Sequence, residues 1–319
     1  MKKIMKGILI TVLIAAGMLA GVFFFIKSRF PSNGNNAITD EYYLNFHSDK
    51  KLEAKYSGIG TYDVSYSEIK SDNTSIDKIR IWYPSVLEHD SRRYPMIMVV
   101  NASGSPASVY EPFFRRLASW GFITVGNEDP QTGTGETTSI TLETVLNHNG
   151  NIVCDRIDEN NIGIIGYSQG GAGALAALSE YENGRVYKTV FTGSAAYQVL
   201  AENLGWHYDV TKIHVPYFMT AGTGRSDDAE TEDITKEFAG VCPLQSLIEN
   251  YNGITDDVLK VRARAAGAEH KEILAKSDGY MTAWMLYQLC GDEEAAEVFI
   301  GENAEILNNP NWQDVEKNR

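Results

Sequence analysis

Short apolar runs alternate with amphipathic segments along most of this 319-residue chain, and this alternation limits the possible folds more than any other feature. The runs that predict strands are residues 79–83, 96–100, 122–125, 162–165, 186–191, 214–220 and 258–263. The segments that predict helices are residues 107–120, 142–148, 170–181, 233–250 and 279–289. Apolar strands separated by helices are typical of an α/β protein whose mostly parallel central sheet has helices on both faces. Catalytic side chains in such a sheet are expected at the carboxyl ends of the strands.

The N-terminal segment predicts a membrane anchor over residues 1–30. Residues 7–26 contain no charged side chain, and a helix of about 20 residues spans the roughly 30 Å of a bilayer core. The basic residues that flank this run are Lys2, Lys3, Lys6, Lys27 and Arg29. The short basic end is expected to stay in the cytoplasm, which places the rest of the chain outside the membrane. The alternative is a cleaved signal peptide, although its apolar region is usually only about 7–15 residues long.

The remaining sequence divides into a short linker and one domain. Residues 31–40 are rich in Pro, Ser, Asn and Gly and predict a linker, whereas residues 41–319 predict a single α/β domain. The chain has 42 acidic and 28 basic side chains and a formal net charge of −14. This charge disfavours nucleic acid as a partner, because phosphate binding requires clusters of Lys and Arg. The oligomeric state stays open.

Three cysteines occur, Cys154, Cys242 and Cys290, and no two of them form a C-x-x-C pair. The spacing excludes a zinc ribbon and a thioredoxin-type redox motif. A disulfide is permitted outside the cytoplasm, and Cys242 with Cys290 is the candidate pair. Two buried thiols at these positions are the alternative, and Cys154 is expected to be unpaired.

The strongest motif is a G-x-S-x-G turn between a strand and a helix. Residues 161–178 read NIGIIGYSQGGAGALAAL, and Ser168 is the serine of the motif. Such a turn holds the serine in a strained backbone conformation and exposes its hydroxyl at the strand end. Gly166 and Gly170 leave the space that the sharp turn requires. The sequence therefore predicts Ser168 as a nucleophile; the alternative is a glycine-rich turn with an idle serine.

A serine nucleophile needs a histidine base, and the histidine needs an orienting acid. With an elbow of this kind, the chain order is serine, acid, histidine. His207, His214 and His270 follow Ser168. His214 lies inside a predicted strand, and His207 lies in an aromatic loop. His270 directly follows the last predicted strand, so we expect it to be the base.

The acid is expected directly after the strand run 214–220, where Asp227 and Asp228 stand side by side. Adjacent side chains in an extended segment point in opposite directions, so only one can face His270. Asp227 comes first and is our choice, with Asp228 as the rival that faces water. The acidic residues that follow could instead form a solvated loop or a Ca²⁺ site, although they lack the spacing of a known calcium loop. They are Glu230, Glu232 and Asp233.

Two backbone N–H groups are needed to bind the oxyanion that forms on the substrate. One is expected from Gln169, the residue after the nucleophile. The other is expected from the loop of residues 101–105 that follows the strand run 96–100, with Ser103 as the donor.

From about residue 96 to residue 299, the chain resembles the α/β-hydrolase superfamily, in particular bacterial cutinase-like polyester hydrolases and dienelactone-hydrolase-like esterases. The matching segments, in family order, are VVNASGS, YEPFFRRLASWGFITVG, DENNIGIIGYSQGGAGAL, VPYFMTAGT and GYMTAWMLYQLCGDEEAAEVF. The chain departs from the family pattern at Asn101 and Ala102, where the family has His or Pro followed by Gly. Residues 239–255 have no counterpart and are expected near the substrate mouth.

The resemblance implies the α/β-hydrolase fold and a role for each matching residue. It implies Ser168 as nucleophile, His270 as base, Asp227 as acid, Ser103 and Gln169 as oxyanion donors, and Tyr197 as an aromatic residue that lines the ester cleft. No metal or cofactor is implied.

The sequence as a whole predicts a membrane-anchored, extracytoplasmic serine hydrolase that cleaves small or polymeric carboxylic esters through an acyl-enzyme. An acyltransferase or a peptidase with the same three residues is one alternative. A non-catalytic surface binding protein on a hydrolase scaffold is another.

Overall fold

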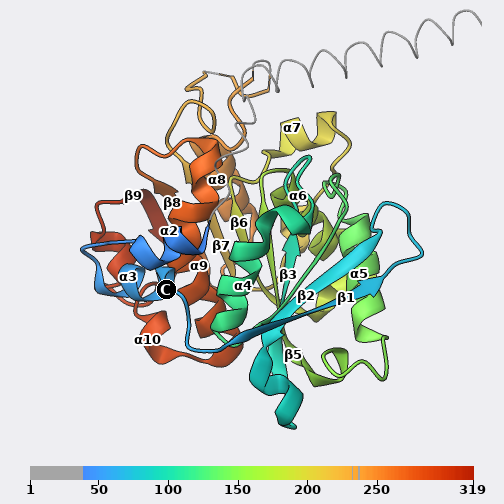
Figure 1. Ribbon diagram of the computed structural model, residues 1–319. Coiled ribbons are helices and arrows are strands. Elements are labelled where there is room, and N and C mark those ends of the chain that lie inside the picture. Colours follow the sequence, from blue (N-terminus) through green and yellow to red (C-terminus); the bar gives the residue numbers. More distant parts are fainter. Residues whose placement is uncertain (1–38, 232, 236–237) are drawn as a thin grey trace, which may run out of the picture. The chain divides into compact units, whose positions relative to one another are not determined.

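A nine-stranded sheet organises the part of the chain that the computed structural model describes, residues 39–231, 233–235 and 238–319 (Figure 1). The strand order is β1-β2-β4-β3-β5-β6-β7-β8-β9. The strands are β1 (Val64–Lys70), β2 (Lys78–Pro84), β3 (Tyr94–Val100), β4 (Ile123–Asn127), β5 (Ile157–Tyr167), β6 (Tyr187–Gly193), β7 (Tyr217–Gly222), β8 (Lys260–Ala265) and β9 (Trp312–Lys317). The run from β4 to β8 is parallel, and β1, β2 and β9 pair antiparallel at the two edges. The predicted α/β class and mostly parallel sheet are confirmed.

The predicted membrane anchor lies outside the described residues, as does the predicted linker up to residue 38. Within the described part of the chain, no helix combines the length and the apolar character needed to cross a membrane.

Helices cover both faces of the sheet, because its central strands are apolar on both sides. In β3, Met96, Met98 and Val100 belong to one core together with side chains of α5, α6 and α8. Ile97 and Val99 belong to a second core with side chains of α3, α4, α9 and α10. Successive side chains of a strand point to opposite faces, so the two cores lie on opposite sides of the sheet. The helices are α2 (Asp40–Asn45), α3 (Lys51–Ser57), α4 (Glu111–Ser119), α5 (Glu136–Leu146), α6 (Gln169–Ser179), α7 (Gln198–Asn203), α8 (Leu244–Gly253), α9 (Ile273–Cys290) and α10 (Glu293–Ala296).

The helix predicted over residues 233–250 is largely wrong. The observed helix α8 begins only at Leu244, and its N-cap is Pro243. Gly240 has a φ of 95°, a conformation outside any right-handed helix. The helix predicted over residues 142–148 is also too short, because α5 begins at Glu136.

A fully buried ion pair joins the two main helices on one face of the sheet. Arg116 of α4 lies 3.2 Å from Asp278 of α9, and neither side chain is exposed. Arg116 also donates to the Tyr56 carbonyl at 3.0 Å and to Thr282 Oγ1 at 2.8 Å. Burial raises the pKa of Asp278 to about 6, against the opposing influence of the Arg116 guanidinium.

Arg116→Met is expected to lower the free energy of unfolding by about 3–5 kcal/mol at pH 8, because it leaves the buried Asp278 carboxylate unpaired. The raised pKa of Asp278 means that the folded state binds its proton more tightly than the unfolded chain does. Stability therefore falls as pH rises through the interval between the unfolded and folded pKa values. Without the Arg116 guanidinium, the pKa of Asp278 in the folded state rises further. The loss of unfolding free energy in Arg116→Met should therefore be smaller at pH 5.5 than at pH 8.

Urea unfolding of both proteins at the two pH values tests this expectation. Arg115→Met is the matched control, because Arg115 is the neighbouring arginine on α4 and its side chain is 42% exposed. Its loss should cost at most about 1 kcal/mol. If Arg116→Met lost the same unfolding free energy at both pH values, the loss could not come from an unpaired Asp278 carboxylate.

Candidate active site

Ser168 occupies a sharp turn between β5 and α6, as the motif predicts. Its backbone angles are φ 58° and ψ −124°, outside the regions that a serine normally adopts. A Cβ built on Gly166 would lie 2.1 Å from the Gly170 carbonyl oxygen, and one on Gly170 would lie 2.1 Å from the Val100 carbonyl oxygen. Both positions therefore require glycine, and the start of α6 lies directly against the end of β3.

The structure brings Ser168, His270 and Asp227 into one hydrogen-bonded line. His270 Nε2 lies 2.9 Å from Ser168 Oγ, and His270 Nδ1 lies 2.6 Å from Asp227 Oδ1. The Asp227 side chain is fully buried, and that of His270 is 15% exposed. A carboxylate accepts hydrogen bonds, so Nδ1 carries the proton and Nε2 is left to accept from the serine hydroxyl.

Further donors hold the second oxygen of the Asp227 carboxylate. Ser194 Oγ donates to Asp227 Oδ2 at 2.5 Å, and the Gly222 N–H donates to the same atom at 2.7 Å. Because both carboxylate oxygens are engaged, the carboxylate has a fixed orientation toward His270.

Asp228 does not face His270, but the expectation that it faces open water is wrong. Its Oδ2 lies 2.7 Å from Arg264 Nη1, and its side chain is 15% exposed. The Leu244 N–H donates to the same oxygen at 3.2 Å. Arg264 also pairs with Asp314 at 2.8 Å. Asp228 therefore belongs to a structural ion-pair network that fixes the start of α8.

The loops that carry Asp227 and His270 are joined by contacts that the sequence analysis missed. The His270 N–H donates to Ser226 Oγ at 2.8 Å. The Ser226 N–H donates to Glu269 Oε2 at 3.0 Å, and the Ser226 hydroxyl donates to the same oxygen. These hydrogen bonds from Ser226 lower the pKa of Glu269. Each loop thus contributes two adjacent residues, Ser226 with Asp227 and Glu269 with His270, to one junction.

Residues 239–255, which were expected near the substrate mouth, contact the loop that carries Asp227. The Val241 N–H donates to the Ser226 carbonyl, and the Cys242 N–H donates to the Asp227 carbonyl, both at 3.0 Å. The first residues of this segment therefore hold the backbone of Ser226 and Asp227 in place.

Tyr167 is a second residue that the sequence analysis missed. Its ring stacks on the His270 imidazole, with ring centroids 5.2 Å apart and an interplanar angle of 24°. Its hydroxyl donates to the His270 carbonyl oxygen at 2.6 Å. The sequence shows an aromatic residue directly before Ser168, but it does not show that the loop of His270 lies over the Tyr167 ring.

Tyr167→Phe is expected to lower kcat/KM for an ester about threefold to tenfold, because it removes the hydrogen bond to the His270 backbone and keeps the stacked ring. Ester hydrolysis across a range of pH values measures the effect. Tyr187→Phe is the control: Tyr187 is buried in β6, and its hydroxyl has no hydrogen-bond partner among the described residues. Equal activity of the two variants would contradict a positioning role for the Tyr167 hydroxyl.

The two proposed oxyanion donors lie in different surroundings. Gln169 is the first residue of α6, and the first N–H groups of a helix have no acceptor within the helix. Ser103 lies in an exposed turn closed by the Ser105 N–H, which donates to the Ala102 carbonyl at 3.1 Å. Gly104 has a φ of 69°, which this turn requires.

Asn101, the residue directly after β3, fixes the base of this turn. Its side-chain amide donates to the carbonyl oxygens of Asn127 at 2.7 Å and Asp129 at 2.8 Å. Its own carbonyl accepts from Thr132 Oγ1 at 2.6 Å. The buried asparagine therefore holds the end of β3 to the loop that follows β4.

Tyr197, the remaining site candidate, is tied to this centre through its neighbour in the chain. Tyr197 is the N-cap residue of α7 and is 4% exposed, and its N–H donates to the Val241 carbonyl at 3.0 Å. The preceding residue, Ala196, donates its N–H to the Ser168 carbonyl at 3.3 Å.

His207, one of the two other histidines after Ser168, is exposed and lies 3.8 Å from Glu202. The strand position predicted for His214 is wrong, because Pro216 cannot donate to the sheet and β7 begins after it.

The cysteines and acidic residues form neither of the sites considered for them within the described part of the chain. All three cysteines are free thiols, with Cys242 buried and Cys290 exposed. No described group of three or more His, Cys, Asp or Glu side chains could hold a metal ion, and Glu232 lies outside the described residues.

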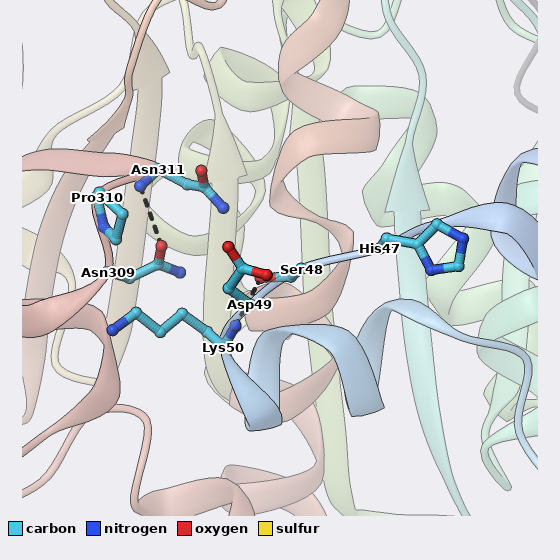
Figure 2. Close-up of a pocket in the computed structure, with 7 residues that line it drawn as sticks. All are labelled: His47, Ser48, Asp49, Lys50, Asn309, Pro310 and Asn311. Atoms are coloured by element: carbon cyan, nitrogen blue, oxygen red, sulfur yellow. Dashed lines mark hydrogen bonds between the residues drawn. The ribbon is translucent and has the colours of Figure 1, made fainter.

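A polar hollow of about 190 Å³ lies where α3 begins, and none of the six candidate site residues is among those that line it (Figure 2). It is lined by His47, Ser48, Asp49, Lys50, Asn309, Pro310 and Asn311. In Figure 2 the Asn311 N–H donates to the Asn309 side chain, and the Lys50 N–H donates to Ser48 Oγ. Each of these bonds closes a turn within its own segment.

Comparison with known proteins adds no family. A scan against protein-family models finds no match, and a search of the curated proteins finds no match either.

Proposed function

We propose that this chain is a serine hydrolase that cleaves carboxylic esters through an acyl-enzyme intermediate. The observation that carries the proposal is the position of His270, with Nε2 at 2.9 Å from Ser168 Oγ and Nδ1 at 2.6 Å from Asp227 Oδ1. A hydroxyl nucleophile needs an adjacent base, and the base needs an acid that fixes its tautomer.

In the proposed reaction, Ser168 Oγ attacks the ester carbonyl carbon while its proton passes to His270 Nε2. The N–H groups of Gln169 and Ser103 stabilise the negative charge on the carbonyl oxygen. His270 then protonates the leaving alcohol, and the acyl group remains on Ser168. Water that gives its proton to the same imidazole cleaves the acyl-enzyme, while Asp227 stabilises the imidazolium in both halves of the reaction.

We also propose the α/β-hydrolase fold for residues 41–319. The position of each residue supports it: Ser168 follows β5, Asp227 follows β7 and His270 follows β8. Serine, acid and histidine follow one another along the chain in the order that this fold uses. The strained backbone of Ser168 between two indispensable glycines supports the same assignment.

Reaction with a fluorophosphonate probe tests the function most directly. Only a serine activated by a neighbouring base attacks such a probe at an appreciable rate. The purified full-length chain should incorporate one probe molecule, peptide mapping should locate it on Ser168, and an ester substrate should slow the labelling. No labelling, or labelling elsewhere in the chain, would refute the proposal.

We further propose that residues 7–26 hold the protein in the membrane with residues 41–319 outside the cytoplasm. The uncharged run and its flanking basic residues support this topology. The full-length protein should stay with membranes after carbonate extraction, and external protease should reach its domain. An N-terminal sequence that begins after Ile26 would show cleavage and contradict the anchor.

A further inference from the structure

The carboxylate of Glu269 lies against the loop that carries Asp227, although Glu269 itself belongs to the loop that carries His270. The Ser226 N–H donates to Glu269 Oε2 at 3.0 Å, and the Ser226 hydroxyl donates to the same oxygen. A Cβ built on Gly224 would lie 2.5 Å from the carboxyl carbon of Glu269 and 2.7 Å and 2.8 Å from its two oxygens. Glycine at position 224 therefore leaves the room that this carboxylate occupies.

The loop that receives this carboxylate is a closed turn. The N–H groups of Asp227 and Asp228 both donate to the Gly224 carbonyl, at 3.0 Å and 2.9 Å. Asp227 is therefore part of the same turn in which Gly224 and Ser226 contact Glu269. The position of the Asp227 backbone is thereby set relative to the Glu269 carboxylate.

The same contact reaches the backbone of His270. The Ser226 Oγ that donates to Glu269 accepts from the His270 N–H at 2.8 Å. Hydrogen bonds from Ser226 and from the Arg225 backbone lower the pKa of Glu269, so its carboxylate is charged at neutral pH. Hydrogen bonds to a charged acceptor are the stronger ones. The contact that depends on this arrangement is that of His270 Nδ1 with Asp227 Oδ1, at 2.6 Å.

Other hydrogen bonds join the two loops farther along the chain from the reacting side chains. The Gly224 N–H donates to the Ala268 carbonyl, and the Gly267 N–H donates to Thr223 Oγ1, both at 2.8 Å. These bonds do not use the Glu269 side chain and should keep the loops together when it is replaced. A substitution at position 269 therefore tests the placement of the reacting groups more than the folding of the loops.

We infer that Glu269 is a positioning residue whose carboxylate, acting through Ser226, sets the distance between His270 and Asp227. Its effect on the reaction rate rests on the proposed ester hydrolase function, whereas its effect on the hydrogen bond between His270 and Asp227 does not. Glu269 fixes the acid and the base relative to each other before a substrate is bound.

Glu269→Ala in the full-length protein is expected to lower kcat/KM for p-nitrophenyl acetate about tenfold to a hundredfold, because misplacing catalytic groups by about 1 Å costs roughly a hundredfold. The loss should lie in kcat, because the inference gives Glu269 no contact with the substrate. Glu269→Gln keeps one acceptor oxygen for Ser226 and should lose less. Equal losses in both variants would indicate an effect of charge alone and overturn the inference.

Glu272→Ala is the matched control. Glu272 lies in the same 3₁₀ turn, His270–Glu272, is exposed like Glu269, and accepts from the Glu269 N–H at 2.9 Å in the capping box of this turn. The control removes a carboxylate near His270 and half of the capping box, while the bonds between Glu269 and Ser226 remain. We expect a similar fall in melting temperature and a kcat/KM within about threefold of the wild type. A rate loss equal to that of Glu269→Ala would overturn the inference.

A double variant tests whether the effect passes through Ser226. Ser226→Ala should also lower kcat, because it removes the acceptor of the His270 N–H. If Glu269 acts through Ser226, the variant with both substitutions should lose much less rate than the product of the two single losses. Losses that multiply in full would overturn this route.

The proton between His270 Nδ1 and Asp227 Oδ1 supplies a readout that needs no substrate. Its ¹H NMR signal should shift, or be lost by exchange with water, in Glu269→Ala and keep its wild-type position in Glu272→Ala. An unchanged signal in Glu269→Ala would overturn the inference. If the signal responds as expected but the wild type shows no Ser168-dependent ester hydrolysis, the proposed function fails and the positioning role stands.

Discussion

Alanine at position 168 is expected to lower kcat for ester hydrolysis by about 10⁴–10⁶ and to abolish fluorophosphonate labelling. Ser168 Oγ is the only atom in the described site that is placed to attack while His270 Nε2, at 2.9 Å, takes its proton. The substitution keeps the backbone, including the Ser168 N–H that donates to the Gly193 carbonyl at 3.0 Å. The melting temperature should therefore stay nearly unchanged.

Ser103→Ala is the matched control for this variant. Its side chain is exposed, and the proposed mechanism uses only its backbone N–H. The control should keep ester hydrolysis within about tenfold of the wild type, because a lost exposed hydroxyl changes little beyond local hydrogen bonding. Rates and melting temperatures of both variants are measured together. Substantial turnover by Ser168→Ala would remove Ser168 from the role of nucleophile.

Asp227→Asn is expected to lower kcat by about 10⁴, by analogy with the loss of the orienting carboxylate in other serine hydrolases. An asparagine can present its NH₂ group to His270 Nδ1, which favours the tautomer with the proton on Nε2. That tautomer cannot accept the proton of Ser168. The bonds from Ser194 and Gly222 to the other carboxylate oxygen hold the side chain at this site, so it cannot turn away.

Asp228→Asn should show the opposite pattern and so serves as the control. It weakens the ion pair of Asp228 with Arg264, which lies at 2.7 Å and also pairs with Asp314. We expect a lower melting temperature and a kcat within about tenfold of the wild type, because a partly buried pair contributes to stability and not to proton transfer. Steady-state kinetics and thermal unfolding of the two variants separate the roles. A loss of activity confined to Asp228→Asn would reject Asp227 as the acid.

The sequence is sufficient to predict the parts of the fold whose residues are dictated by local requirements. β3 presents apolar side chains on both of its faces, so its central place in a parallel sheet follows from its composition. The turn around Ser168 follows from two glycines that no larger residue can replace. The order of serine, acid and histidine then restricts the base to one histidine.

The sequence is not sufficient where contacts between distant segments decide the structure. β1 and β9 are polar strands at the edges of the sheet, and only pairing with a neighbour identifies them. Asp228 looks like an exposed acid until Arg264, on the next strand, is placed beside it. The hydrogen bonds of Ser226 with Glu269 and His270 depend on two loops whose meeting no local pattern encodes.

These loop contacts have a consequence for transferring the site to another scaffold. Two hydrogen bonds to the His270 backbone accompany the contacts of its imidazole with Asp227 and Ser168. The His270 N–H donates to Ser226 Oγ, next to Asp227, and the Tyr167 hydroxyl, next to Ser168, donates to the His270 carbonyl oxygen. Grafting Ser168, Asp227 and His270 alone would carry over the reacting atoms without the two braces that keep the imidazole between them. A transplantable unit must therefore include Tyr167 and Ser226 in addition to the three residues and the glycines and donors that hold them.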